Sequence, residues 1–186
     1  MLSHLRAAAT LLGILTVFLG LLYPAAMTAV AGALFPAQAS GSIVFRDGKP
    51  VGSSLLGQLF ARPGYLQPRP SAAGSGYDGA SSSGTNLAPT SAKLAERLKT
   101  DGEAMKAATG AAVLPADAIT TSGSGLDPDV SPAFAELQVA RIARARGVPA
   151  DAVRRAIAEN TTGRTLAVLG EPRVNVLAVN LALDAA

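Results

Sequence analysis

The sequence predicts an α+β protein that consists of one N-terminal transmembrane helix and a small α+β domain outside the cytoplasm. Three observations support this fold class. No Asp, Glu, Lys or Arg occurs in the 39 positions 7–45. After this stretch, an Asp-Gly turn signal separates two short apolar segments, as in a β-hairpin. The rest of the chain contains helical patterns that begin at Ser or Pro and end at Gly.

Length and composition exclude several classes of protein. A chain of 186 residues accommodates one domain and a membrane segment. Cysteine is absent and His4 is the single histidine, which excludes disulfide frameworks, Cys/His zinc sites and Ser-His-Asp triads. The net charge of +3 is small and dispersed, so no nucleic-acid partner is expected. We therefore expect no catalytic residues and no metal site.

The uncharged stretch predicts a single membrane span. Residues 11–30 are predominantly apolar, and twenty helical residues span about 30 Å, the thickness of the hydrocarbon core. Pro24 removes one helical hydrogen bond and predicts a kink at Tyr23. We expect a cytoplasmic N-terminus at residues 1–10, a transmembrane helix at 11–35 and a periplasmic domain at 36–186.

A cleaved signal peptide is the main alternative to an uncleaved anchor. Residues 29–31 and 37–39 resemble signal-peptidase sites, but the apolar run is longer than the usual 7–15 or so residues, which favours the anchor. Arg6 before the span favours a cytoplasmic N-terminus, whereas Arg46 and Lys49 after it weaken that preference. Small residues also recur at four-residue spacing in the span. They indicate either a helix partner or a chance match in an alanine-rich segment.

The first part of the domain predicts a hairpin followed by a long loop. Residues 43–45 and 51–56 flank Asp47-Gly48, which predicts a short β-hairpin. Residues 62–91 are rich in Pro, Gly and Ser, a composition typical of a flexible linker. Aromatic and leucine residues occur within this loop, which favours an ordered, functional excursion instead.

The second part of the domain predicts four helices. The first is capped by Thr90 or Ser91 and ends at Gly110, and the second runs from Ser131-Pro132 to Arg146. The third runs from Pro149 to about Asn160. A closing helix follows Pro172, because Val174, Leu177, Ala178 and Leu181 are spaced i, i+3, i+4 and i+7.

A Gly/Ser turn at residues 120–132 is the most unusual segment. It leads into the N-terminus of a helix, where free N–H groups and the helix dipole favour an anion. It matches no standard nucleotide motif, since it lacks Gly-Lys-Ser/Thr and has Pro128 where G-x-G-x-x-G needs its third glycine. Asp127 and Asp129 also oppose an anion. A structural turn and a ligand or partner contact both remain open.

Polar residues of the second helix raise two further questions. Gln138 shares a face with Phe134, Ala135 and Ile142, where an unpaired amide costs about 1–3 kcal/mol. It is therefore either a satisfied core glutamine or a contact to a ligand or partner. A basic cluster follows, which forms either a solvated face or a surface for acidic partners or lipid headgroups. Its members are Arg141, Arg144, Arg146, Arg154 and Arg155.

Four blocks of the chain form a set whose order and spacing are specific. The blocks are VGSSLLGQLF (51–60), RPSA (69–72) leading to GTNLAP (84–89), TSGSGLDPDVSP (121–132) with QVARIARARG (138–147), and LGEPRVNVLAVNLAL (169–183). With the N-terminal span they cover nearly the whole chain. In these blocks the chain resembles the C chain of the bacterial potassium-transporting Kdp ATPase.

The resemblance implies a single-pass inner-membrane subunit of a complex that imports potassium using ATP. The implied partners are a pore-like potassium-binding subunit, a catalytic P-type ATPase subunit and a small single-helix subunit. The implied role is that of a non-catalytic assembly or chaperone subunit that raises the affinity of the catalytic subunit for ATP, with no tightly bound cofactor of its own.

The resemblance also implies site residues. It associates the nucleotide with Gln138 and, more loosely, with Ser124 and Gly125, while partner contact is expected at Arg69, Ser71, Asn86 and Asp127. A periplasmic domain cannot meet cytoplasmic ATP, so topology opposes the nucleotide role. The alternative function is a membrane-anchored periplasmic module that binds a small anion with loops 71–91 and 121–125.

Overall fold

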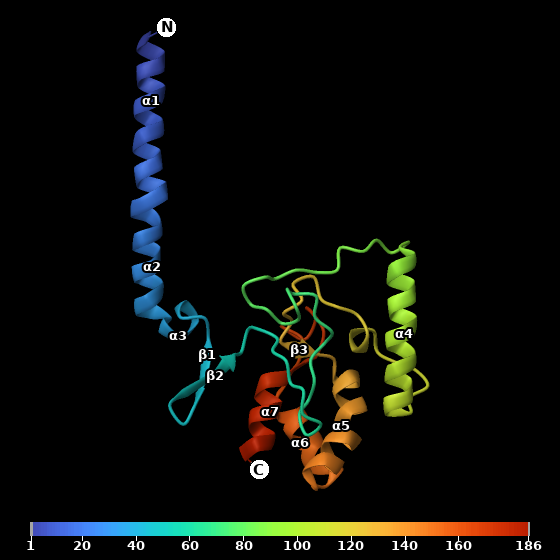
Figure 1. The fold of residues 1–186 in the computed structure, drawn as a ribbon. Helices are drawn as coiled ribbons and strands as arrows, with labels where there is room; N and C mark the ends of the chain where they lie inside the picture. The colour runs from blue at the N-terminus through green and yellow to red at the C-terminus, as the bar shows by residue number, and fades with distance from the viewer. Residues whose placement is uncertain (1, 186) are drawn as a thin grey trace. The chain divides into compact units, whose positions relative to one another are not determined.

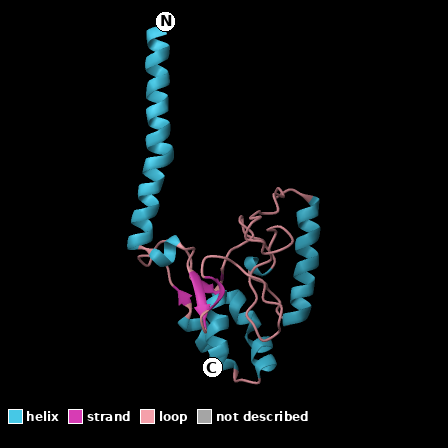
Figure 2. Ribbon diagram, turned by 60° about the vertical axis from the view of Figure 1, so that its left-hand side comes forward, coloured by secondary structure: helices cyan, strands magenta, loops and turns pink. Residues whose placement is uncertain are grey.

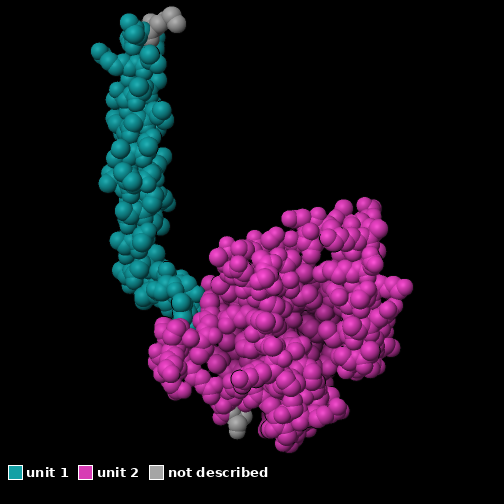
Figure 3. All heavy atoms as spheres, viewed as in Figure 1, with its two compact units in different colours: residues 1–44 teal, residues 45–186 magenta. Residues whose placement is uncertain are grey.

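The computed structural model describes residues 2–185. The chain divides into two compact units, residues 1–44 and 45–186, which are coloured separately in Figure 3. The first unit is an apolar helix and the second is the α+β domain, so the predicted fold class is confirmed.

The first unit is a continuous helix from Leu2 to Leu34, followed by the short helix α3 (Pro36–Ala39) (Figure 1). The long helix consists of α1 (Leu2–Val17), the π-helical turn η1 (Phe18–Leu22) and α2 (Tyr23–Leu34). Among the described residues it is the one helix long and apolar enough to cross a membrane, with a mean hydropathy of 2.0 in its most apolar window. It extends beyond both ends of the twenty apolar residues that predict it.

A π-helical turn precedes Pro24, and the kink expected at Tyr23 stays a prediction. The Tyr23 N–H donates to the Phe18 carbonyl, five residues back, so one turn widens to π-helical geometry just before the proline. Pro24 has no N–H to donate to the preceding turn, yet the helix continues beyond the π-helical turn to Leu34.

The domain begins with a hairpin and a long loop. Strands β1 (Ile43–Arg46) and β2 (Lys49–Ser53) pair in a two-stranded sheet, which confirms the predicted hairpin. Asp47 and Gly48 at its turn have φ values of 51° and 74°, the left-handed conformation that such a turn requires. The following loop, residues 54–91, is ordered, because Leu66 and Ala73 within it are fully buried. The ordered excursion, and not the flexible linker, is therefore observed.

Three helices and a small antiparallel sheet form the core of the domain (Figures 1 and 2). Helix α5 packs against α6, and α6 packs against α7, while β5 contacts both α5 and α7. The sheet order is β3-β5-β4, with Val130 and Thr161 both opposite Val174. The bounds are β3 (Asp129–Val130), α5 (Pro132–Arg146), α6 (Ala150–Glu159), β4 (Thr161–Thr162), β5 (Arg173–Asn175) and α7 (Val176–Ala185).

Helix caps match the sequence signals at several ends. The Ser131 hydroxyl accepts from the Phe134 N–H at 3.0 Å, and Gly147 ends α5 in the left-handed conformation. Helix α4 (Ala92–Thr109) has Ser91 at its N-cap position without a side-chain bond, and Gly110 ends it. Figures 1 and 2 show α4 at the side of the core, followed by the short 3-10 helix η2 (Ala116–Ala118).

The prediction for the closing helix was wrong at its start. Val174 does not begin a helix but lies in the central strand β5, where it is fully buried between β3 and β4. The helix starts at Val176, and the Asn175 side chain accepts from the Ala178 N–H at 3.0 Å as its cap. The spacing of the apolar residues predicts a helix here. The strands that pair with β5, namely β3 and β4, lie elsewhere in the sequence and leave no local signal at Val174.

Candidate functional site

The long loop is fixed to the helices by two side-chain carboxamides. Asn180 of α7 pairs with both backbone groups of Leu66, accepting from its N–H at 2.7 Å and donating to its carbonyl at 2.9 Å. Gln138 of α5 does the same with the next residue, Gln67, at 2.8 and 3.0 Å. Each carboxamide thus makes the two hydrogen bonds that a neighbouring β-strand would make, since it offers one acceptor and one donor as the backbone of a paired residue does. We call residues 64–73 the clamped segment.

Both carboxamides are deeply buried, with exposed fractions of 4% for Gln138 and 2% for Asn180. Buried amides are tolerated when their hydrogen bonds are made, and here the partners are backbone groups of the loop. Gln138 is therefore a satisfied core glutamine in this structure. The sequence interpretation overlooked Asn180, although the same signal was present, because it is an amide within the apolar pattern of the closing helix.

Arginines of α5 hold the start of the clamped segment. The Arg141 guanidinium donates to the carbonyls of Pro63 and Tyr65 and, at 2.6 Å, to the Gln138 side chain. Burial lowers the pKa of Arg141. Arg146 donates to the Gly64 carbonyl at 2.6 Å and stacks over the Tyr65 ring at 5.0 Å. These two members of the basic cluster are packed against the loop, so neither the solvated face nor the surface for acidic partners or lipid headgroups describes them.

The rest of the basic cluster is exposed. Arg154 forms ion pairs with Glu136 at 2.8 Å and Asp151 at 3.0 Å, while Arg144 and Arg155 lie at the surface. The five arginines are close in sequence, which predicts one cluster. In the structure Arg141 and Arg146 are partly buried, whereas the other three are exposed.

The Gly/Ser turn is packed against the clamped segment. The Ser71 hydroxyl donates to the Gly125 carbonyl at 2.6 Å and accepts from the Ala73 N–H at 3.1 Å. The Ser124 carbonyl accepts from the Ser83 N–H at 2.9 Å. Gly125 has φ of 68°, and a Cβ there would lie 2.5 Å from the Ser83 carbonyl oxygen. Glycine at 125 is thus required for packing, so the structure supports the structural interpretation of this turn.

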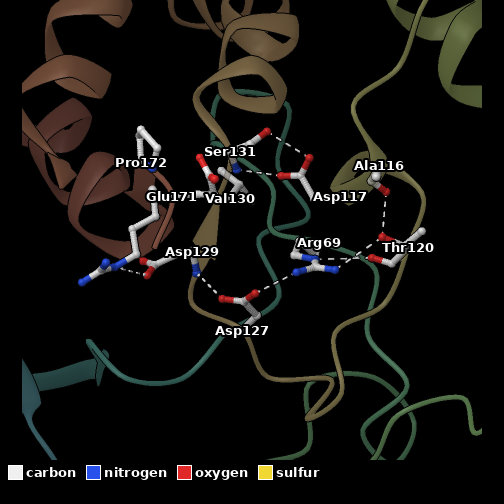
Figure 4. Close-up of a pocket in the computed structure, with 11 residues that line it drawn as sticks. Arg69, Ala116, Asp117, Thr120, Asp127, Asp129, Val130, Ser131, Glu171 and Pro172 are labelled. Atoms are coloured by element: carbon white, nitrogen blue, oxygen red, sulfur yellow. Dashed lines mark hydrogen bonds and ion pairs between the residues drawn. The ribbon is translucent and has the colours of Figure 1, made fainter. Parts of the chain in front are cut away.

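Arg69 joins the clamped segment to the Gly/Ser turn on both sides of Gly125 (Figure 4). Its guanidinium pairs with Asp127 at 2.9 Å and donates to the Thr120 carbonyl at 3.4 Å and the Thr120 hydroxyl at 3.3 Å. A further bond at 3.4 Å reaches the Thr121 carbonyl. Arg69 therefore bridges two loops that are about fifty residues apart in sequence.

The N-terminus of α5 is already occupied by a carboxylate of the chain itself. Asp117 accepts from the Ser131 N–H at 2.6 Å and from its hydroxyl at 2.9 Å (Figure 4). The adjoining depression of about 420 Å³ is lined by four carboxylates and two guanidinium groups. Negative charge at this end of the helix opposes a further anion. The geometry does not favour the anion cradle that the turn suggested. The charged residues are Asp117, Asp127, Asp129, Glu171, Arg69 and Arg173.

The structure thus brings together five of the seven candidate residues along the clamped segment, whereas Ser124 is bonded to Ser82 and Ser83 of the long loop. Gln138 contacts residue 67, Arg69 contacts Asp127, and Ser71 contacts the Gly125 turn. Asn86 is exposed, has a left-handed backbone with φ of 52°, and takes no part in the hydrogen bonds described above. The candidates form a network that fixes loops to helices, and no grouping of His, Cys, Asp and Glu suited to a metal occurs in the described residues.

Comparison with known proteins gives one consistent family. The family profile described as "KdpC: K+-transporting ATPase, c chain" matches residues 5–185. A "Potassium-transporting ATPase KdpC subunit" from Caulobacter vibrioides (strain NA1000 / CB15N) is 55% identical over 100% of this chain and 94% of its own length. Proteins of the same description from Bradyrhizobium diazoefficiens and Methylorubrum populi are 51% and 53% identical, covering 100% and 99% of this chain and 98% of each relative.

Proposed function

Because this chain belongs to the KdpC family of K+-transporting ATPase c chains, we propose that it is a non-catalytic accessory subunit of an ATP-driven potassium-import complex. Its role in that complex is to stabilise the assembly and to raise the affinity of the catalytic subunit for ATP. The partners are a pore-like potassium-binding subunit, a catalytic P-type ATPase subunit and, where present, a small single-helix subunit.

The observation that carries this proposal is the unburied apolar helix Leu2–Leu34. None of its most apolar window is buried within the chain, so its side chains need lipid or other helices around them. Its length of 33 residues corresponds to about 50 Å, longer than the roughly 30 Å hydrocarbon core. We propose that the helix anchors the chain in the inner membrane, with the N-terminus cytoplasmic, as Arg6 before the span favours, and the domain periplasmic.

The domain contributes by binding and not by chemistry. Apart from Asn86, its polar candidates are hydrogen-bonded within the domain: the carboxamides hold the clamped segment, and Arg69 and Ser71 hold the Gly/Ser turn. Such a network stiffens a loop-rich domain, and a stiff domain can brace a larger partner. We infer that ATP affinity is raised indirectly, through the assembled state of the catalytic subunit, since the Gln138 amide is occupied by Gln67.

The proposal is tested by deleting the chain from cells that grow at micromolar potassium. Pump-dependent growth should be lost and should return with the full chain, while the other subunits are still synthesised. Purified complex lacking the chain should also show a raised KM for ATP. Unaffected growth and an unchanged KM would refute the proposal.

A further inference from the structure

The β4–β5 connection forms a projecting finger that the network described above does not use. We define the finger as residues 163–172, between the paired strands β4 and β5. All residues from 162 to 173 are exposed, whereas Val174 at its base is fully buried in the core. The finger thus continues at both ends into paired strands, and its own side chains are exposed.

The tip of the finger is a hydrogen-bonded turn. The N–H of Thr165 donates to the Leu169 carbonyl and the N–H of Leu169 donates to the Thr165 carbonyl, both at 2.9 Å. Between them Leu166 and Ala167 have φ values of 53° and 63°. The left-handed region is uncommon for residues other than Gly, Asn and Asp, and such strained conformations concentrate at functional sites.

This turn presents three aliphatic side chains to the surroundings. Leu166 is 83% exposed, Val168 is 70% exposed and Leu169 is 60% exposed. A single exposed leucine needs no explanation, but three aliphatic residues within four positions of a hydrogen-bonded turn form an apolar patch, which is a feature of contact surfaces. Asparagine or glycine would fit the backbone of residue 166 better, so the leucine there opposes the conformational preference of the turn.

The charges of the finger favour a protein over a lipid surface. Arg164 pairs with Glu171 at 2.6 Å, and Arg173 at its base pairs with Asp129 at 3.1 Å. The finger therefore offers no excess positive charge to anionic headgroups, and it contains no Trp or Tyr for the membrane interface. An uncharged apolar recess complements an aliphatic knob whose charges are already paired.

We propose that the finger docks its tip, Leu166, Val168 and Leu169, into an apolar recess on the extracytoplasmic surface of another subunit of the transport complex. This inference rests on the proposed function, since it needs an assembly with other subunits. It assigns the contact to one turn of the chain, away from the clamped segment. A few well-packed residues carry most of the binding energy at many interfaces.

Leu166→Asn separates binding from folding. Asparagine has a similar size and tolerates the left-handed backbone, so the full chain in detergent should keep its unfolding midpoint. The control is Val113→Asn, because Val113 is an apolar residue with a similar exposed fraction, 82%, outside the finger. We expect the Leu166→Asn variant to bind the remaining subunits at least tenfold more weakly, and the Val113→Asn variant to bind as the parent does. Equal binding of all three proteins would overturn the proposal.

A photoreactive benzophenone side chain at position 166 identifies what the tip contacts in the assembled complex. A covalent adduct with another subunit supports the proposal. Adducts with lipid, adducts with a second copy of this chain, or none at all would overturn it. If deletion of the chain impairs potassium uptake but Leu166→Asn assembles normally, the finger proposal fails while the proposed function stands; if deletion has no effect, the proposed function itself fails.

Discussion

Replacing Gln138 by methionine removes the carboxamide that pairs with Gln67 while keeping the length of the side chain. The backbone N–H and carbonyl of Gln67 then face an apolar thioether, and Arg141 loses an acceptor at 2.6 Å. Methionine is also a good helix former, so α5 itself should be preserved.

The cost follows from the hydrogen bonds that are lost. An unpaired buried donor or acceptor costs about 1–3 kcal/mol, and two backbone groups are affected here. Since Gln67 is only partly buried, water recovers part of this cost, and we expect a loss of about 2–4 kcal/mol in the free energy of unfolding. For a domain of this size, that lowers Tm by roughly 10 °C.

The assay is thermal unfolding of the full chain in detergent, followed by far-ultraviolet circular dichroism. Gln67→Met is the matched control, because Gln67 uses its backbone and not its side chain in the pair. This variant makes the same Gln-to-Met change at the other residue of the pair, and its free energy of unfolding should stay within about 0.5 kcal/mol of that of the parent. Equal stability of the two variants would show that the clamp does not hold the loop.

The same two variants examine the nucleotide role implied for Gln138. If Gln138 acts only through the fold, the Gln138→Met variant that still assembles should leave the KM of the complex for ATP unchanged. A raised KM in a Gln138→Met complex that is assembled as fully as the parent complex would contradict our inference and indicate direct contact with the nucleotide.

The remaining predictions concern three other positions. Asn180→Leu should destabilise the domain by about 2–5 kcal/mol in urea titrations, because it leaves both backbone groups of the fully buried Leu66 unpaired. Gly125→Ala should lower Tm well below that of Gly123→Ala, since a Cβ at 125 lies 2.5 Å from the Ser83 carbonyl oxygen and one at 123 meets nothing within 4 Å; equal midpoints would contradict the packing described here. Burial raises the pKa of Asp184, but hydrogen bonds from Arg146 and Tyr65 and the charges of Arg146 and Arg46 outweigh it and lower the pKa overall. Because its pKa is lower in the folded state, the ionised Asp184 carboxylate stabilises the fold above the unfolded pKa of about 3.9, and this stabilisation is lost as the pH falls through the folded pKa. The free energy of unfolding of the Asp184→Asn variant should therefore depend less on pH below about pH 4, as measured by unfolding at a series of pH values.

Local chemistry determined the elements that depend on neighbouring residues. The uncharged stretch specified the long helix, because hydrophobicity and length suffice for a membrane span. Asp47-Gly48 specified the hairpin turn, and Ser131, Pro132 and Gly147 specified the ends of α5. These signals act over a few residues, so they can be interpreted without knowledge of the fold.

The tertiary structure decided what each polar candidate does. Gln138 was recognisable as an amide that needed a partner, but its partner is the backbone of Gln67, 71 positions earlier, and a backbone group carries no sequence signal. Val174 lies in a strand because β3 and β4 pair with it on both sides, although the spacing of the apolar residues around it is helical. Asp117 caps the N-terminus of α5 and so decides between the structural turn and the ligand contact that the Gly/Ser sequence left open. Hydrogen bonds and strand pairing between distant segments depend on chain folding, and for that reason only the three-dimensional arrangement determined them.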